Sequence, residues 1–96
     1  MPNHKVMPID QLILHVEKIC RQNKVAHLSL FGSHATGTAT ERSDVDFIIY
    51  GCENKEKLTE DIDNIPTLRK IDLFFYDEIY SKYLKEDIDQ YGKPIY

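Results

Sequence analysis

Residues 32–47, GSHATGTATERSDVDF, contain a Gly-Ser pair followed, after ten intervening residues, by an Asp-x-Asp pair. The run Val45–Tyr50 is rich in β-branched and aromatic residues and ends at Gly51, which is typical of a β-strand. Side chains two residues apart on a strand point to the same face. Asp44 and Asp46 are therefore expected to lie side by side and to bind a cation as a unit.

A third aspartate, Asp72, lies near the start of a second run with strand character, Ile71–Tyr76. If the two strands pair, Asp72 joins Asp44 and Asp46 at one edge of a sheet. Neighbouring carboxylates oppose one another's ionisation, and a divalent cation removes that cost. Mg²⁺ prefers oxygen ligands, and two such ions about 3.5 to 4 Å apart can stabilise an in-line phosphoryl displacement. The sequence thus predicts a two-Mg²⁺ site that uses a nucleoside triphosphate.

The Gly-Ser pair follows a predicted strand at Val25–Phe31 and precedes a short segment that ends at Gly37. Backbone N–H groups at a strand-to-helix turn attract anions, and glycine lets a phosphate approach closely. Ser33 adds a hydroxyl donor. We therefore expect Gly32 and Ser33 to bind phosphate. The adjacent His34 either touches phosphate or is a partly exposed loop histidine, and the second interpretation is favoured.

These motifs resemble those of the minimal nucleotidyltransferases (MNT type) of the DNA polymerase β superfamily. The resemblance spans residues 25–76 and consists of Phe31-Gly32-Ser33, Asp44-Val45-Asp46-Phe47 and Asp72 between two apolar residues. It implies an α/β (α+β) fold, in which a small mixed β-sheet has helices packed on one side. Residues 1–96 would form a single nucleotidyltransferase domain.

The resemblance also implies chemistry and partners. Asp44, Asp46 and Asp72 would be the catalytic, metal-binding residues, and Gly32 and Ser33 would hold the triphosphate. The reaction would transfer a nucleoside monophosphate, most simply AMP from ATP, to an acceptor hydroxyl. Stand-alone MNT proteins of this size are commonly encoded beside an all-helical HEPN-domain ribonuclease toxin, and several act as antitoxins that adenylylate a tyrosine of that partner.

The sequence departs from many relatives, which carry arginines after the Gly-Ser pair, as in GSRARG. Here His34 and Thr36 occupy those positions, and the nearest basic residues are Arg42, Arg69 and Lys70. The missing arginines favour an alternative, a non-catalytic binding module that neutralises a HEPN partner sterically, whereas the three aspartates oppose it. A second alternative is an aminoglycoside-type, small-molecule nucleotidyltransferase, for which a homo-oligomer would have to supply the acceptor pocket.

Length and composition limit the other functions. The chain has 96 residues and a net charge of −4, which suits one small domain and argues against direct nucleic-acid binding through a basic surface. Two cysteines at unrelated positions indicate neither a disulfide framework nor a zinc site. No apolar run is long enough for a signal peptide or a membrane span. We expect a soluble cytoplasmic protein with no membrane contact.

Hydrophobic spacing predicts alternating helices and strands. Besides the three strands above, the expected elements are a helix from Pro8 to about Asn23, a helix Lys55–Asn64 capped by Asn54, a last helix capped by Asp77 and ending before Gly92, and an edge strand at 93–96. The last helix carries an aromatic stripe that includes Tyr80 and Tyr83. This stripe is expected to face the core, with an aromatic contact surface as the alternative.

Overall fold

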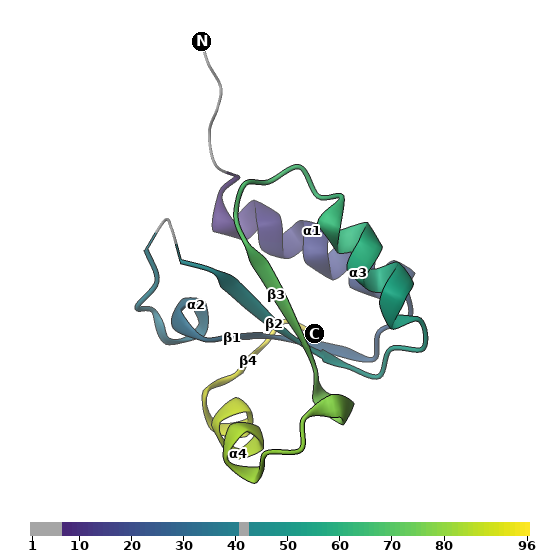
Figure 1. The fold of residues 1–96 in the computed structure, drawn as a ribbon. Helices are drawn as coiled ribbons and strands as arrows, with labels where there is room; N and C mark the ends of the chain where they lie inside the picture. The colour runs from purple at the N-terminus through teal and green to yellow at the C-terminus, as the bar shows by residue number, and fades with distance from the viewer. Residues whose placement is uncertain (1–6, 41–42) are drawn as a thin grey trace.

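The computed structural model describes residues 7–40 and 43–96, and its centre is a four-stranded mixed sheet in the order β3-β2-β1-β4 (Figure 1). Strand β1 (His27–Phe31) runs antiparallel to β2 (Val45–Tyr50) and to β4 (Lys93–Pro94). Strand β3 (Ile71–Phe75) runs parallel to β2, and the crossover between them contains helix α3 (Lys55–Asp63). A parallel pair needs such a long connection because its strands start at the same edge.

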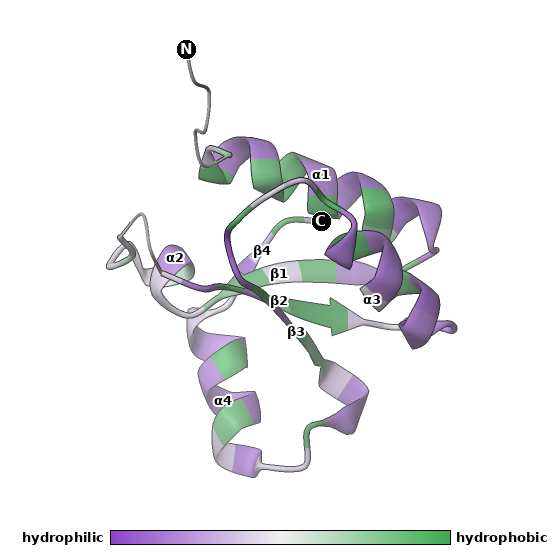
Figure 2. Cartoon of the chain, turned by 45° about the horizontal axis from the view of Figure 1, so that its top comes forward, coloured by the Kyte–Doolittle hydropathy of each residue, from purple (hydrophilic) through white to green (hydrophobic). Residues whose placement is uncertain are grey.

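Helices α1 (Ile9–Gln22) and α3 cover one face of the sheet (Figure 1). Apolar and polar residues alternate along α1 at helical spacing (Figure 2), which is the pattern of an amphipathic helix. The buried residues of α1 recur every four positions and pack against apolar side chains of β1 and β2. The main core consists of Leu12, Val16, Cys20, Val25, Leu28, Leu30, Val45, Phe47, Ile49, Leu58, Ile62 and Ile65.

The opposite face is covered in part by helix α4 (Lys82–Tyr91), around a second cluster of Ile48, Ile79 and Ile88. The predicted α/β class and mixed sheet are confirmed, and α1 and α3 share one side as expected. The prediction that all helices pack on one side is wrong, because β2 carries an apolar side chain, Ile48, on its second face. That side chain is fully buried, and α4 provides the cover.

The start of the last helix differs from the prediction. Residues Tyr76–Glu78 form a 3₁₀ turn, and Ile79 is extended, so α4 begins only after Ser81, whose hydroxyl accepts a hydrogen bond from the Leu84 N–H (3.2 Å). Asp77 is therefore not the cap. Tyr80 and Tyr83 are 91% and 80% exposed, so the predicted core stripe is wrong at both positions. The reason is that the extended segment brings Ile79 into the core and leaves Tyr80 facing solvent.

The other predicted elements are confirmed within a few residues. Asn54 caps α3 by accepting a hydrogen bond from the Lys57 N–H (3.0 Å), and β4 pairs with β1 as an edge strand. Strand β1 starts at His27 rather than at Val25, because the chain first turns at Lys24, whose φ is 58°. None of the helices within the described ranges is long and apolar enough to cross a membrane.

Candidate active site

Three neighbouring strands align their side chains in a row at one edge of the sheet. Phe31 of β1 is the register partner of Asp46 of β2, and Asp46 is the partner of Asp72 of β3. Directly opposed residues of paired strands point to the same face. Asp44 lies just before β2, two residues ahead of Asp46, and is exposed. The structure therefore brings Asp46 and Asp72 together on the face of the sheet that α4 partly covers, with Asp44 close enough for its charge to act on Asp46.

The charges of these side chains act on one another. The pKa of Asp46 is raised above its usual value, first by burial, then by the charge of Asp72 and a side-chain hydrogen bond with it, and then by the charge of Asp44. His34 acts in the opposite direction and lowers the pKa of Asp46. An ionised Asp46 thus stands in a negative field, which is the electrostatic environment of a cation site.

The turn after β1 lies against the Asp46 carboxylate. Gly32 has φ 72° and ψ −151°, a region that essentially only glycine adopts. A Cβ atom at this position would stand 2.5 Å from Asp46 Oδ2. The Gly32 carbonyl accepts hydrogen bonds from the N–H groups of Ala35 (3.0 Å) and Thr36 (3.2 Å). The residue must therefore be glycine both for its backbone angles and for its distance from the carboxylate.

Helix α2 (Ser33–Thr36) is a single turn that begins immediately after Gly32 and ends at Gly37, whose φ is 79°. The predicted change from strand to helical turn is confirmed. The first N–H groups of any helix have no acceptor inside the helix. In α2 these groups belong to Ser33 and His34, which follow Gly32 directly.

Of the three basic residues proposed to replace the missing arginines, Arg69 and Lys70 belong to the described part of the chain. Arg69 donates a hydrogen bond from Nε to the Met7 carbonyl (3.1 Å), at the start of α1. Lys70 is exposed, and its carbonyl accepts from the Val45 N–H (2.9 Å). Arg42 lies outside the described residues. His34 is partly exposed, as expected, but it belongs to the single turn of α2 rather than to a loop, and it lowers the pKa of Asp46. Its position next to the Gly-Ser pair was the available signal.

The donor set fits Mg²⁺ that arrives with a substrate. Across residues 7–40 and 43–96, no three His, Cys, Asp or Glu side chains form a ready-made metal group. Asp46 and Asp72, however, are register partners on β2 and β3, and the charge of Asp72 raises the pKa of Asp46. Mg²⁺ is usually held by one or two protein carboxylates together with substrate phosphates and waters. Two adjacent carboxylates with exposed Asp44 beside them match that arrangement.

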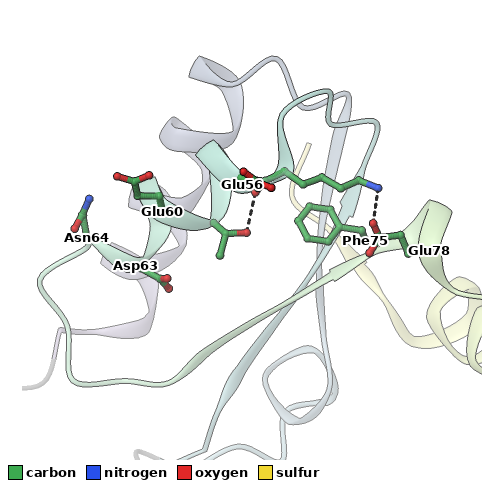
Figure 3. Close-up of a pocket in the computed structure, with 8 residues that line it drawn as sticks. Glu56, Glu60, Asp63, Asn64, Phe75 and Glu78 are labelled. Atoms are coloured by element: carbon green, nitrogen blue, oxygen red, sulfur yellow. Dashed lines mark hydrogen bonds and ion pairs between the residues drawn. The ribbon is translucent and has the colours of Figure 1, made fainter.

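A separate hollow of about 460 Å³ lies between α3 and the far end of β3 (Figure 3). It is on the face of the sheet opposite to the aspartate row, because Phe75 and Asp72 differ in strand parity. Lys55 closes one end by bonding to Glu78 (2.8 Å). Its lining includes four carboxylates, from Glu56, Glu60, Asp63 and Glu78. Such a negative lining would repel a triphosphate, so this hollow is not the candidate donor site.

Comparisons with known proteins identify the family of this chain. The family model described as polymerase beta, nucleotidyltransferase, matches residues 15–96. A Methanocaldococcus jannaschii protein that is provisionally named a protein adenylyltransferase is 33% identical over 89 residues, which cover 85% of this chain and 89% of that protein.

Two solved structures share the fold. A toxin-antitoxin with AMP-PNP aligns with a TM-score of 0.65 and 23% identity, over 93% of this chain and 73% of the other. A mutant of the toxin-antitoxin MntA-HpeT aligns with a TM-score of 0.62 and 22% identity, over 84% and 69%. Because the family model and the archaeal relative both span most of the sequence, we conclude that this chain belongs to the polymerase β nucleotidyltransferase family and is a nucleotidyltransferase.

Proposed function

We propose that this nucleotidyltransferase transfers AMP from ATP to a tyrosine hydroxyl of a HEPN-domain toxin and thereby acts as an antitoxin. The observation that carries the proposal is the row formed by Asp46 and Asp72, with Asp44 and the Gly32 turn beside it. Two comparisons support the acceptor class. The archaeal relative is named for protein adenylylation, and the structural neighbours are toxin-antitoxin proteins.

On the donor side, Gly32 and Ser33 would hold the β- and γ-phosphates of ATP. Glycine leaves the backbone N–H groups open to a close phosphate, and the Ser33 hydroxyl adds a donor. Asp44 and Asp46 would both bind two Mg²⁺ ions, and Asp72 would bind the one nearer the acceptor. Bound Mg²⁺ supplies positive charge to the reacting phosphoryl group and to the leaving pyrophosphate.

On the acceptor side, the tyrosine oxygen forms a bond to the α-phosphorus, and the bond from that phosphorus to the β-phosphate bridging oxygen breaks. The bonding electrons leave with pyrophosphate. Asp72 would take the hydroxyl proton; its position beside Asp46 in the row supports this role, and a carboxylate can act as a general base. Orientation of the two reactants is the main contribution of the remaining residues.

The test uses α-labelled ATP and Mg²⁺ with the purified chain, alone and with a HEPN-domain toxin as the partner, followed by intact-mass analysis of both proteins. We expect one AMP to be added to the partner, and we expect the addition to disappear in the Asp44→Asn, Asp46→Asn variant. A matched control is Asp63→Asn, an exposed carboxylate on α3 away from the row, which should retain transfer.

The outcomes separate the proposed function from its alternatives. A stable complex that neutralises the toxin with no AMP transfer would reject catalysis and favour a steric binding module. Labelling of an aminoglycoside in the absence of any protein partner would reject the protein acceptor. Label on the partner's tyrosine, removed when that tyrosine is replaced by phenylalanine, is the result that the proposed function requires.

A further inference from the structure

The side chain of His34 has an unused hydrogen-bonding atom. Its Nε2 is buried and has no hydrogen-bond partner among the described residues. Leaving a buried polar group unpaired destabilises the fold, because the group loses its hydrogen bonds to water and gains none in return. Buried polar side chains are nearly always paired, so an exception at a functional site points to a missing ligand or water.

The surroundings of the ring indicate the kind of ligand. His34 is the residue after Ser33 on α2, and its charge lowers the pKa of Asp46. The ring is thus close to the carboxylate row without being hydrogen-bonded to it at Nε2. A neutral imidazole carries its hydrogen on one of its two ring nitrogens, and in the tautomer with the hydrogen on Nε2 this atom is a donor. A donor beside the proposed phosphate turn would suit a phosphate oxygen.

The other basic residues increase the importance of this donor. Residues 33–37, which follow Gly32, contain no arginine or lysine. Arg69 is bonded to Met7 at the start of α1, Lys57 pairs with Asp61 (2.8 Å), and Lys55 pairs with Glu78 on the other face. His34 acts on Asp46 in the direction opposite to the neighbouring carboxylates, because it lowers the pKa of Asp46.

We propose that His34 is a triphosphate-binding residue whose Nε2–H donates a hydrogen bond to a β- or γ-phosphate oxygen of the bound nucleotide. The inference rests on the proposed use of ATP. It adds that His34 makes the site bind a nucleoside triphosphate more tightly than a monophosphate. Its geometry follows from the turn, since Gly32 and Ser33 immediately precede it in the chain.

The experiment measures binding of AMP-PNP and of AMP, each with Mg²⁺, by titration calorimetry to the wild-type chain and two variants. In His34→Phe the ring is kept and the donor is removed, and we expect AMP-PNP to bind about tenfold more weakly, the effect of one charge-assisted hydrogen bond. AMP lacks both outer phosphates, so the affinity of His34→Phe for AMP should differ from that of the wild type by less than about twofold. In His34→Gln an amide N–H₂ replaces Nε2–H, and AMP-PNP affinity should largely return.

Two further readouts make the result decisive. The melting temperature of His34→Phe should equal or exceed that of the wild type, because an unpaired buried nitrogen has been removed. The ¹⁵N resonance of His34 Nε2 should shift on addition of AMP-PNP and not of AMP. If the wild type binds AMP-PNP and His34→Phe binds it equally well, or loses AMP-PNP and AMP affinity alike, the role of His34 is wrong and the proposed function stands. If the wild type does not bind AMP-PNP at all, both fail.

Discussion

Replacing Gly32 by alanine tests whether the turn and the aspartate row form one structural unit. The new Cβ would stand 2.5 Å from Asp46 Oδ2, and the backbone has φ 72° and ψ −151°. The backbone strain costs about 1 to 3 kcal/mol, and the overpacking adds about 1 to 3 kcal/mol. We therefore expect Gly32→Ala to lower the free energy of unfolding by about 3 to 4 kcal/mol, taken from the middle of these ranges.

Gly37→Ala is the matched control, because it lies at the other end of the same helical turn. Its φ is also positive, 79°, but nothing lies within 4 Å of a Cβ built there. Only the left-handed backbone is then penalised, by about 1 to 2 kcal/mol. Urea unfolding followed by circular dichroism measures both variants. Transfer activity should be lost in Gly32→Ala, since the carboxylate has to move, and should survive in Gly37→Ala.

A double-mutant cycle with Asp46→Ala isolates the contact. Without the carboxylate, the atom of Asp46 nearest to the new Cβ would be its own Cβ at 3.7 Å, an ordinary distance. The two substitutions should therefore couple by about 1 to 3 kcal/mol. Additive effects, or a Gly32→Ala cost no larger than that of Gly37→Ala, would refute the argument that the turn is fitted to the carboxylate.

Three other predictions follow from burial and charge. Tyr80 and Tyr83 are exposed, so Tyr80→Ser and Tyr83→Ser should each change the free energy of unfolding by less than about 0.5 kcal/mol. Phe47 is fully buried, so Phe47→Ala should lower it by about 3 to 5 kcal/mol. Urea titrations compare the three variants. Burial raises the pKa of the Cys20 thiol to about 12, so the folded state holds this proton more tightly than the unfolded state does. The resulting stabilisation is complete below the unfolded pKa and is lost as the pH rises through the folded pKa. Between about pH 9 and 12 the wild type should lose about 1.4 kcal/mol per pH unit more than Cys20→Ala, measured as the slope of stability against pH. The raised pKa of Asp46 means that its ionisation destabilises the metal-free fold as pH rises through the raised value, so in EDTA at pH 7 Asp46→Asn should melt at a higher temperature than the wild type.

Local patterns were sufficient for most of the fold and for the aspartate row. Alternation in Val45–Tyr50 identified β2, and the similar run at 71–76 predicted both β3 and its pairing, so the meeting of Asp46 and Asp72 could be anticipated. The end of the chain was mispredicted because helical spacing alone allowed a helix to start at Asp77. Tertiary packing decided otherwise, when burial of Ile79 required an extended backbone.

The state of His34 could not be read from the sequence for a different reason. Spacing shows that a residue follows the Gly-Ser pair, but whether its ring nitrogen is buried depends on how α2 lies against β1 and β2. The same holds for Gly32, whose nearness to Asp46 depends on the pairing of Phe31 with Asp46 across two strands. Both features arise from long-range contacts, which a local pattern does not contain.

The unfavourable features of this fold are concentrated at one place, and that concentration has a thermodynamic consequence. Three carboxylates repel one another, a histidine nitrogen is unpaired, and the turn requires a glycine, which loses more backbone entropy on folding than other residues, all around Asp46. The apolar core that supports the sheet lies on the opposite face, with α1 and α3. A ligand that neutralises the carboxylates and pairs with His34 would relieve two of these costs in the folded state alone. By linkage, Mg²⁺ with a nucleoside triphosphate should then stabilise the chain more than Mg²⁺ and nucleotide do separately. Simple additivity of the two shifts in melting temperature would mean that the metal and the phosphates do not share this site.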